Sequence, residues 1–190
     1  FTVGVVEKDQ IIDGSSITVG NKLIGIASSG LHSNGYSLAR RIIFDRMGLG
    51  IHDQLPGLGA TVAETLLTPT KIYVRAVLNL LKDFRINGIA HITGGGLTDN
   101  VPRILPKLCK ASFKLDSWQR PPVFSLLEEA GKVDQFEMYR TFNMGIGMVL
   151  SVAEQDVDDI LTRLQGLGET AWLVGEVQTR RQDEEQVELL

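Results

Sequence analysis

Hydrophobic and polar positions follow one another in short blocks that predict strands and helices in turn. Near-continuous apolar runs of strand length alternate with segments whose apolar residues recur at helical spacing. The runs that predict strands are residues 2–7, 22–27, 86–92, 111–115, 145–151, 171–177 and 186–190. The segments that predict helices are residues 36–47, 62–67, 72–84, 97–105, 122–130, 135–139 and 157–164. Hairpin-like and crossover connections together predict an α/β (α+β) fold with a mixed β-sheet covered by helices.

The strongest helical pattern covers residues 72–84. Val74, Val77, Leu78 and Leu81 form one apolar stripe there, as in a helix that packs on a core. In contrast, residues 48–59 contain four glycines and one proline and predict a long surface loop. No linker or change in composition divides the chain, so we expect one domain.

Composition is that of an ordinary soluble globular protein. The chain has 190 residues, a formal charge of −4 and 43% hydrophobic residues. It lacks the basic field that nucleic acid requires, so we expect no nucleic-acid partner. No apolar run approaches the roughly 18 residues of a membrane span, so we expect no membrane association. The single cysteine, Cys109, favours a reducing compartment, the cytoplasm, and a buried rather than a reactive thiol. Because the chain opens on Phe1 inside a predicted strand, we expect it to be part of a longer protein.

A polar loop with the sequence SSGLHSNG, residues 28–35, lies between a predicted strand and a predicted helix. Such a junction aims the free N–H groups of the helix N-terminus beyond the sheet edge, where anions bind. Gly30 and Gly35 permit close backbone approach, and His32 is the one titratable group. Short hydrogen-bonding side chains come from Ser28, Ser29, Ser33 and Asn34. Because Ser33 and Asn34 also suit helix capping, the pattern alone favours an anion site and a capped junction equally.

A second glycine loop, with Gly94, Gly95 and Gly96, follows the strand predicted at residues 86–92. Three consecutive glycines cost chain entropy and contribute no packing, so we expect a need for bare backbone. A nest of N–H groups for a phosphate would meet that need, and a tight strand-to-helix turn is the alternative. The helix that follows is predicted to be capped by Thr98 or Asp99.

Other polar residues carry weaker signals. Arg140 and Asn143 could contact a ligand or pin the turn between a helix and a strand, and Arg103 could bind an anion or lie on a solvated face. His91 lies in an apolar strand and is expected in the core, whereas His52 is expected to be exposed. The histidines and the cysteine lack zinc spacing, so we expect no metal site within this chain.

Three motifs of the chain occur together in one known family. They are SSGLHSNGYSL at residues 28–38, AHITGGG at 90–96 with NVPRILP at 100–106, and MYRTFNMGIG at 138–147. Together they resemble the aminoimidazole ribonucleotide synthetase family, the phosphoribosylformylglycinamidine cyclo-ligases of purine biosynthesis. The resemblance continues through VVEK at 5–8 and IIDG at 11–14, and it covers only the carboxy-terminal half of that family. It implies that residues 1–190 are the carboxy-terminal synthetase domain, with residues 1–20 as strand and connector from an amino-terminal domain.

The resemblance implies a three-layer α/β/α domain with a mixed sheet, and it implies a reaction. ATP would phosphorylate the amide oxygen of formylglycinamidine ribonucleotide, and a substrate nitrogen would then close the imidazole ring with loss of phosphate. The amino-terminal domain would hold most contacts to ATP and Mg²⁺ and form the homodimer, which leaves this chain as the substrate-side half, inactive alone. Two alternatives stay open: the synthetase domain of formylglycinamide ribonucleotide amidotransferase, and a non-catalytic relic domain of the same superfamily.

Residue by residue, the resemblance implies a catalytic role for His32, which would polarise or deprotonate the reacting amide. A helix N-terminus would favour its neutral form. The residues implied to bind the substrate and its phosphates are Ser28, Ser29, Gly30, Ser33, Asn34, Gly94, Gly95, Gly96, Asn100, Arg103, Thr141 and Asn143.

Overall fold

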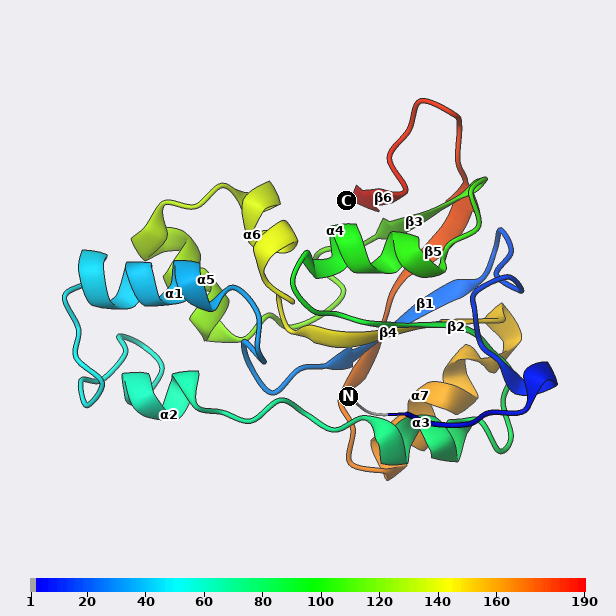
Figure 1. The fold of residues 1–190 in the computed structure, drawn as a ribbon, viewed down its shortest axis with the longest axis horizontal. Coiled ribbons are helices and arrows are strands. Elements are labelled where there is room, and N and C mark those ends of the chain that lie inside the picture. The colour runs from blue at the N-terminus through cyan, green and yellow to red at the C-terminus, as the bar shows by residue number, and fades with distance from the viewer. Residues whose placement is uncertain (1–2) are drawn as a thin grey trace.

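The chain folds around one twisted, six-stranded sheet (Figure 1). The computed structural model describes residues 3–190. The strands are β1 (Lys22–Ala27), β2 (Ile86–His91), β3 (Cys109–Phe113), β4 (Ile146–Val152), β5 (Ala171–Thr179) and β6 (Val187–Leu189). Their order across the sheet is β2-β4-β1-β5-β3-β6. All neighbours are antiparallel except β3 and β6, which are parallel, so the predicted mixed sheet is confirmed.

Helices cover both faces of the sheet, which gives the expected three-layer α/β/α architecture (Figure 1). The helices are α1 (Tyr36–Arg40), α2 (Val62–Leu66), α3 (Val74–Leu80), α4 (Gly96–Asn100), α5 (Pro122–Gly131), α6 (Gln135–Thr141) and α7 (Val157–Gly166). Helices α3 and α7 pack on one face, and α4 lies on the other beside α6. Helix α1 continues as a π-helical turn, Arg41–Arg46, and α4 as a 3-10 turn, Val101–Ile104.

Each face of the sheet has its own hydrophobic core. Leu23 of β1 packs in one cluster with Leu97 of α4, whereas its neighbour Ile24 packs in the other cluster with Leu80 of α3 and Ile160 of α7. Consecutive strand residues point to opposite faces, and Leu23 and Ile24 are both fully buried. This explains why β1 has a continuous apolar sequence rather than an alternating one.

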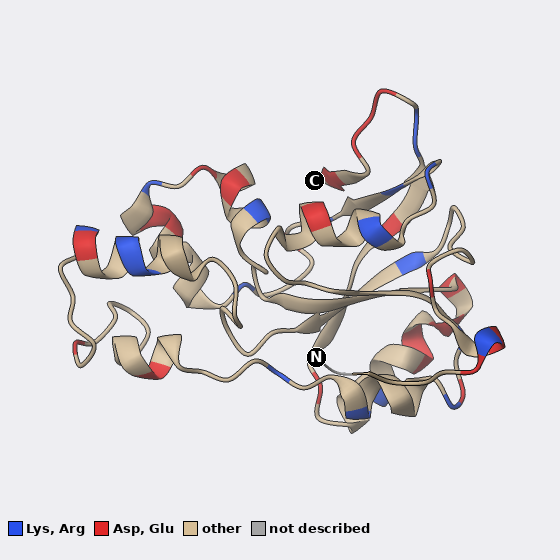
Figure 2. Ribbon diagram, viewed as in Figure 1, with Lys and Arg blue, Asp and Glu red and all other residues tan. Residues whose placement is uncertain are grey.

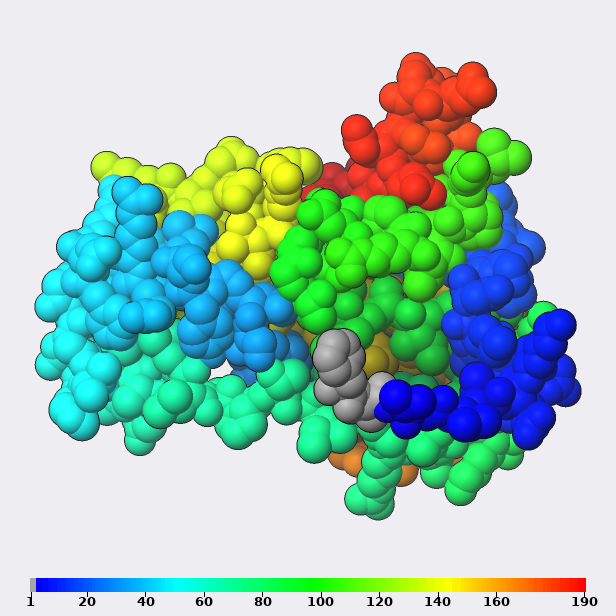
Figure 3. Space-filling view, in the orientation of Figure 1, coloured from blue at the N-terminus to red at the C-terminus, as the bar shows by residue number. Residues whose placement is uncertain are grey.

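Most predicted elements are confirmed, with ends that differ by a few residues. The prediction of a strand at residues 2–7 is wrong for residues 3–7, which are extended without pairing and lead into a 3-10 turn at Lys8–Gln10; residue 2 lies outside the described part. Val3 and Val5 are 91% and 99% exposed, so this β-branched run has no partner strand among residues 3–190. Figure 3 shows this segment at the surface.

The stripe predicted for the helix at 72–84 is wrong at Val74, Leu78 and Leu81, whereas Val77 packs against the core as predicted. Helix α3 is shorter than expected and buries Ala76 and Leu80 instead. Val74 and Leu78 are 61% and 57% exposed, and Leu81 is exposed as well. The periodicity correctly indicated a helix, but most of its apolar stripe faces solvent in this chain.

Charges are distributed evenly in the view of Figure 2, where Lys and Arg are interspersed with Asp and Glu. No helix among residues 3–190 is long and apolar enough to cross a membrane.

Candidate functional site

The three sequence motifs meet beyond the ends of β1, β2 and β4. Asn34 in the first loop donates from Nδ2 to the carbonyl of Ile92, at the end of β2, over 3.2 Å. Asn143, which precedes β4, donates from Nδ2 to the carbonyl of Gly30 over 2.8 Å. A Cβ at Gly96 would collide with the backbone carbonyl oxygen of Tyr139, so the second loop packs directly against α6. The motifs, far apart in sequence, therefore form one site.

Asn143 is the residue that holds the first loop in place. Its side chain is fully buried. Besides the bond to Gly30, its Oδ1 accepts from the Ser28 hydroxyl at 3.0 Å and from the Gly145 N–H at 2.8 Å. The Ser28 hydroxyl also lies 2.9 Å from the Gly30 carbonyl. These bonds occupy both Oδ1 and Nδ2 of Asn143. Any contribution of this residue to ligand binding is therefore indirect, because the side chain fixes the position of the first loop.

Asn100 holds the second loop in place, as Asn143 holds the first. Its Nδ2 donates to the carbonyls of Thr93, Gly94 and Gly96 at 3.2, 3.2 and 2.8 Å, and the Thr93 hydroxyl donates to its Oδ1 at 3.0 Å. The amide thus gathers the carbonyls of the loop on one side. The Gly96 N–H donates to the Thr93 carbonyl at 3.0 Å, so an anion-binding nest in this loop would have to use the N–H groups of Gly94 and Gly95.

The three glycines of this loop, Gly94, Gly95 and Gly96, differ in backbone conformation and in the space around them. Gly95 has a φ of +99°, and a Cβ there would lie 2.5 Å from the Cβ of Asp99. Gly96 has a φ of +57° and the close contact to Tyr139. A Cβ at Gly94 would meet nothing within 4 Å. Packing alone therefore explains two of the glycines, and Gly94 is the position left open for a ligand to approach the backbone.

The predicted cap of α4 by Thr98 or Asp99 is wrong, and the capping alternative for Ser33 and Asn34 is not observed at α1. Helix α1 begins after Gly35 and α4 after Gly95, both in the left-handed conformation, and neither N-cap makes a side-chain bond. Asn34 reaches Ile92 instead, and the Thr98 hydroxyl bonds to the Gly95 carbonyl at 3.0 Å. Asn34 therefore serves a contact between the two loops, whereas Thr98 lies inside α4 and bonds back to the residue before that helix.

His32 is buried, with 5% of its surface exposed, and has a left-handed φ of 56°. Its Nε2 accepts from the N–H of Ser29 at 3.1 Å and from that of Lys71 at 3.4 Å. Desolvation lowers the pKa of His32 to about 4, and the nearby charges of His91 and Lys71 act in the same direction. The imidazole is therefore neutral at pH 7 as expected, although burial rather than a helix N-terminus is the main cause. Because Nε2 accepts, the proton is on Nδ1, which is buried without a partner among the described residues.

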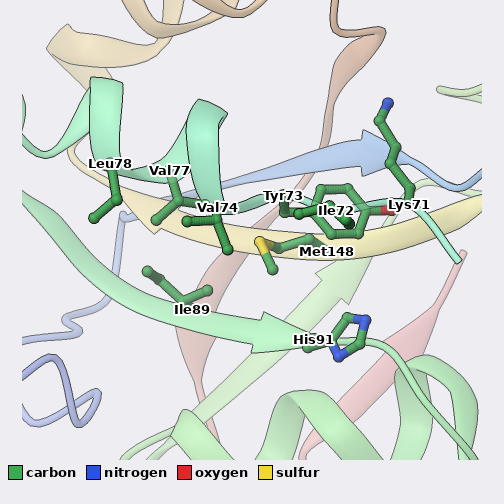
Figure 4. A pocket seen from close by; sticks show the side chains of 9 residues that line it. All are labelled: Lys71, Ile72, Tyr73, Val74, Val77, Leu78, Ile89, His91 and Met148. Carbon is green, nitrogen blue, oxygen red and sulfur yellow. The ribbon is translucent and has the colours of Figure 1, made fainter. Parts of the chain in front are cut away.

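Tyr73 links the first loop to an open apolar groove. Its hydroxyl donates to the Ala27 carbonyl at 3.0 Å, and its ring lies between His32 and His91, with centroids 6.2 and 6.0 Å away. Burial raises the pKa of the Tyr73 phenol, with a further contribution from the charge of Glu169. The groove beyond it has a volume of about 420 Å³. Figure 4 shows its lining residues: Lys71, Ile72, Tyr73, Val74, Val77, Leu78, Ile89, His91 and Met148.

The other predicted site residues lie near the surface of the loops. The Ser29 hydroxyl donates to the Pro69 carbonyl at 2.7 Å, and the hydroxyls of Ser33 and Thr70 lie 3.3 Å apart. Thr141 donates to the Glu137 carboxylate at 3.0 Å. Arg103 is exposed on the 3-10 turn after α4.

The histidine predictions have mixed outcomes. His52 is exposed and Cys109 is buried, as predicted, and burial raises the pKa of the Cys109 thiol. The prediction that His91 lies in the core is wrong, because β2 is an edge strand and His91 faces the groove. Among residues 3–190, no three His, Cys, Asp or Glu side chains are grouped as a metal site would need.

Comparison with known proteins agrees with the three motifs. Residues 18–188 match the family described as AIR synthase related protein, C-terminal domain. The chain belongs to this family. Over its whole length it is 76% identical to a phosphoribosylformylglycinamidine cyclo-ligase of Trichlorobacter lovleyi and 67% identical to one of Geobacter sulfurreducens. It covers 55% of each, so the chain spans about half the length of the curated relatives that it matches.

Solved structures share the fold of this AIR synthase related domain at low sequence identity. Thiamine-monophosphate kinase from Stenotrophomonas maltophilia aligns with a TM-score of 0.62 and 15% identity, over 97% of this chain and 54% of that one. Escherichia coli HypE, a hydrogenase maturation protein, aligns with a TM-score of 0.57 and 20% identity, over 93% of this chain and 48% of its own. Thermotoga maritima PurL, in complex with AMPPCP, aligns with a TM-score of 0.53 and 17% identity, over 93% of this chain and 24% of that one.

Several residues of the site were not found from the sequence. Tyr73 and Lys71 precede a helix in a stretch without any motif, and only their packing against His32 and β4 reveals them. Gly147 carried a usable signal, because a glycine inside a strand often marks close approach by a neighbour. Here that neighbour is the Tyr73 hydroxyl.

Proposed function

We propose that this chain is the carboxy-terminal, substrate-side domain of a phosphoribosylformylglycinamidine cyclo-ligase. The observation that carries the proposal is the 76% identity to a relative of that name over the whole chain. In the proposed reaction, ATP phosphorylates the amide oxygen of formylglycinamidine ribonucleotide. A substrate nitrogen then attacks the same carbon, and phosphate leaves as the imidazole ring closes.

The loops suit this chemistry because phosphoryl transfer depends mainly on positioning and charge stabilisation. The loop around Gly94, with its carbonyls held by Asn100, is proposed to receive a phosphate of the substrate through its N–H groups. The loop around Ser28 to Asn34, held by Asn143, is proposed to form the opposite wall. Exposed Ser29, Ser33 and Arg103 and half-buried Thr141 are proposed to add side-chain contacts.

His32 is proposed to act on the reacting amide. A base must accept a proton, and Nε2 already accepts two backbone N–H groups. The geometry therefore supports polarisation rather than deprotonation, with the Nδ1–H as donor to the amide oxygen. Because Nδ1 is buried, this role requires the first loop to shift when substrate binds.

The Mg²⁺ ion of this reaction does not fit the described residues, since no three carboxylate or imidazole groups converge among them. Mg²⁺ and most of the ATP contacts are therefore proposed to belong to the amino-terminal part. We propose that the complete enzyme is a cytoplasmic homodimer and that the 190-residue chain is inactive alone.

The test is to assay the full-length protein with formylglycinamidine ribonucleotide and Mg-ATP, following ADP, phosphate and the imidazole product. The expected result is one ring closed for each ATP consumed. Amidation of formylglycinamide ribonucleotide in its place would identify the alternative amidotransferase. ATP hydrolysis and ring closure both absent, in a folded protein that still binds the ribonucleotide, would identify a non-catalytic relic.

A further inference from the structure

The apolar groove beside α3 is formed by side chains that a monomeric domain would normally bury. Ile72, Val74 and Leu78 are 79%, 61% and 57% exposed, and they border the groove together with Ile89 and Met148 (Figure 4). The stripe on α3 has the spacing of a core-facing helix, yet only Val77 packs against the core, while Val74 and Leu78 face solvent. A contiguous exposed apolar surface of this kind marks an interaction site.

The amino-terminal segment is the other concentration of exposed apolar side chains. Val3, Val5, Val6 and Ile11 are between 53% and 99% exposed. Ile12, directly after them, packs against the cluster that contains Ala76 and Leu80 of α3. The segment thus joins the core on the face of the sheet that α3 and α7 cover, and Figure 3 shows it at the surface of the molecule.

The edge of the sheet is open at the same place. Within residues 3–190, strand β2 pairs with β4 alone, so its other edge faces no strand, although the Ser16 hydroxyl covers it at the Asn87 carbonyl, at 3.3 Å. Ile89 and His91 lie on this strand and line the groove. An occupant could therefore bury apolar side chains against α3 and bond to the free backbone of β2.

We propose that this groove is the docking surface for the amino-terminal part of the same polypeptide. The proposal rests on the proposed function, because that part is known only from relatives of which this chain covers 55%. The segment that leads to it is anchored through Ile12 on the core of the same face of the sheet, and a tethered partner has a high effective concentration there, in the mM range for short linkers. Through Lys71, Tyr73 and His91 the same contact would reach the first loop. Docking would thereby complete the site rather than only extend the core.

The experiment is thiol labelling of the full-length protein with a Leu78→Cys substitution. Ile51→Cys is the matched control, because Ile51 is 54% exposed, as against 57% for Leu78, and lies in the long loop before α2. We expect the thiol at position 78 to react at least ten times more slowly than the one at position 51. Equal rates would overturn the proposal. Slow labelling that becomes fast on dilution, as a dimer dissociates, would assign the groove to a second copy and would also overturn it.

A second measurement uses the wild-type protein, so that its result does not depend on whether a cysteine variant folds. Hydroxyl-radical footprinting of the full-length wild type should leave Ile72, Leu78 and Met148 unmodified while it modifies Ile51. Modification of all four would overturn the proposal. Because neither readout measures ring closure, a protein that lacks cyclo-ligase activity but protects Leu78 would refute the proposed function and leave the docking surface supported.

Discussion

The hydroxyl of Tyr73 occupies the space that a side chain at Gly147 would need. That hydroxyl donates to the Ala27 carbonyl at 3.0 Å, and a Cβ at position 147 would also lie 2.7 Å from Cε1 of His32. The absence of a side chain on β4 therefore allows Tyr73 to brace the end of β1 and His32 to enter the protein. This single contact couples the groove to the first loop.

Gly147→Ala is expected to destabilise the protein, because the methyl group must displace a buried phenol and an imidazole. Overpacking of this kind costs about 1–3 kcal/mol, which should lower the free energy of unfolding in urea by that amount. The matched control is Gly166→Ala in α7, where a Cβ meets nothing within 4 Å. It should be neutral or slightly stabilising. If Tyr73→Phe did not recover part of the loss in the double variant, the phenol would not be the source of the strain.

Asn143→Ala is expected to weaken both stability and substrate binding. It leaves the Gly145 N–H without its partner, whereas the Ser28 hydroxyl and the Gly30 carbonyl keep the bond that they make with each other. One unsatisfied buried group costs about 1–3 kcal/mol, so we expect a loss of that size in chemical denaturation. KM should rise more than kcat falls, since the loop is displaced rather than the chemistry removed. Ser117→Ala removes one exposed hydrogen bond and is the control; an equally large effect there would contradict the assignment.

The sequence predicted the fold well because both faces of the sheet are covered. Runs such as β1 are apolar at every position, and helices such as α7 bury Val157, Ile160 and Leu164 at the expected spacing. The same reasoning failed for α3, because an apolar stripe does not show which neighbour covers it. Tyr73, Ala76 and Leu80 face the core of this chain, while Val74 and Leu78 face outward.

The candidate site was predicted in part. Its loops were located correctly, but the function of each residue inside them depends on contacts across the fold. Asn143 and Asn100 resemble ligand-binding residues in sequence, yet their amides are occupied by loop carbonyls. His91 was expected in the core because its strand is apolar, and the exposure of that strand's edge follows from the strand order alone.

The pH dependence of stability should report the burial of His32. Its pKa is lowered to about 4 in the folded protein, mainly by desolvation, and it faces Lys71, Tyr73 and His91. The unfolded chain binds a proton near pH 6.5, so unfolding takes up a proton between these values and stability falls as the pH drops from about 6.5 to 4. The loss should approach about 3 kcal/mol at the acid end. His32→Gln cannot titrate, so its free energy of unfolding should vary less over this range; an unchanged slope would refute the assignment.

Substitutions at the three glycines of the second loop should affect ligand binding and stability to different extents. Gly96→Ala must push a methyl group against the Tyr139 carbonyl and hold a φ of +57°, so it should cost stability first. Gly95→Val would lose substrate binding but would also strain a φ of +99° against Asp99, which obscures the cause. Gly94 has no such constraint, and a side chain there points into open space.

Gly94→Val is therefore the informative substitution. Its free energy of unfolding should stay within about 0.5 kcal/mol of wild type, as for an unconstrained surface position. If the loop's N–H groups bind a phosphate, the isopropyl group occupies the approach, and calorimetric titration of the full-length protein should show affinity for the ribonucleotide lowered at least tenfold. Inorganic phosphate should compete with the ribonucleotide in the wild type and lose that competition in the variant. Unchanged affinity with unchanged stability would mean that the phosphate binds elsewhere and that Gly94 serves only the turn.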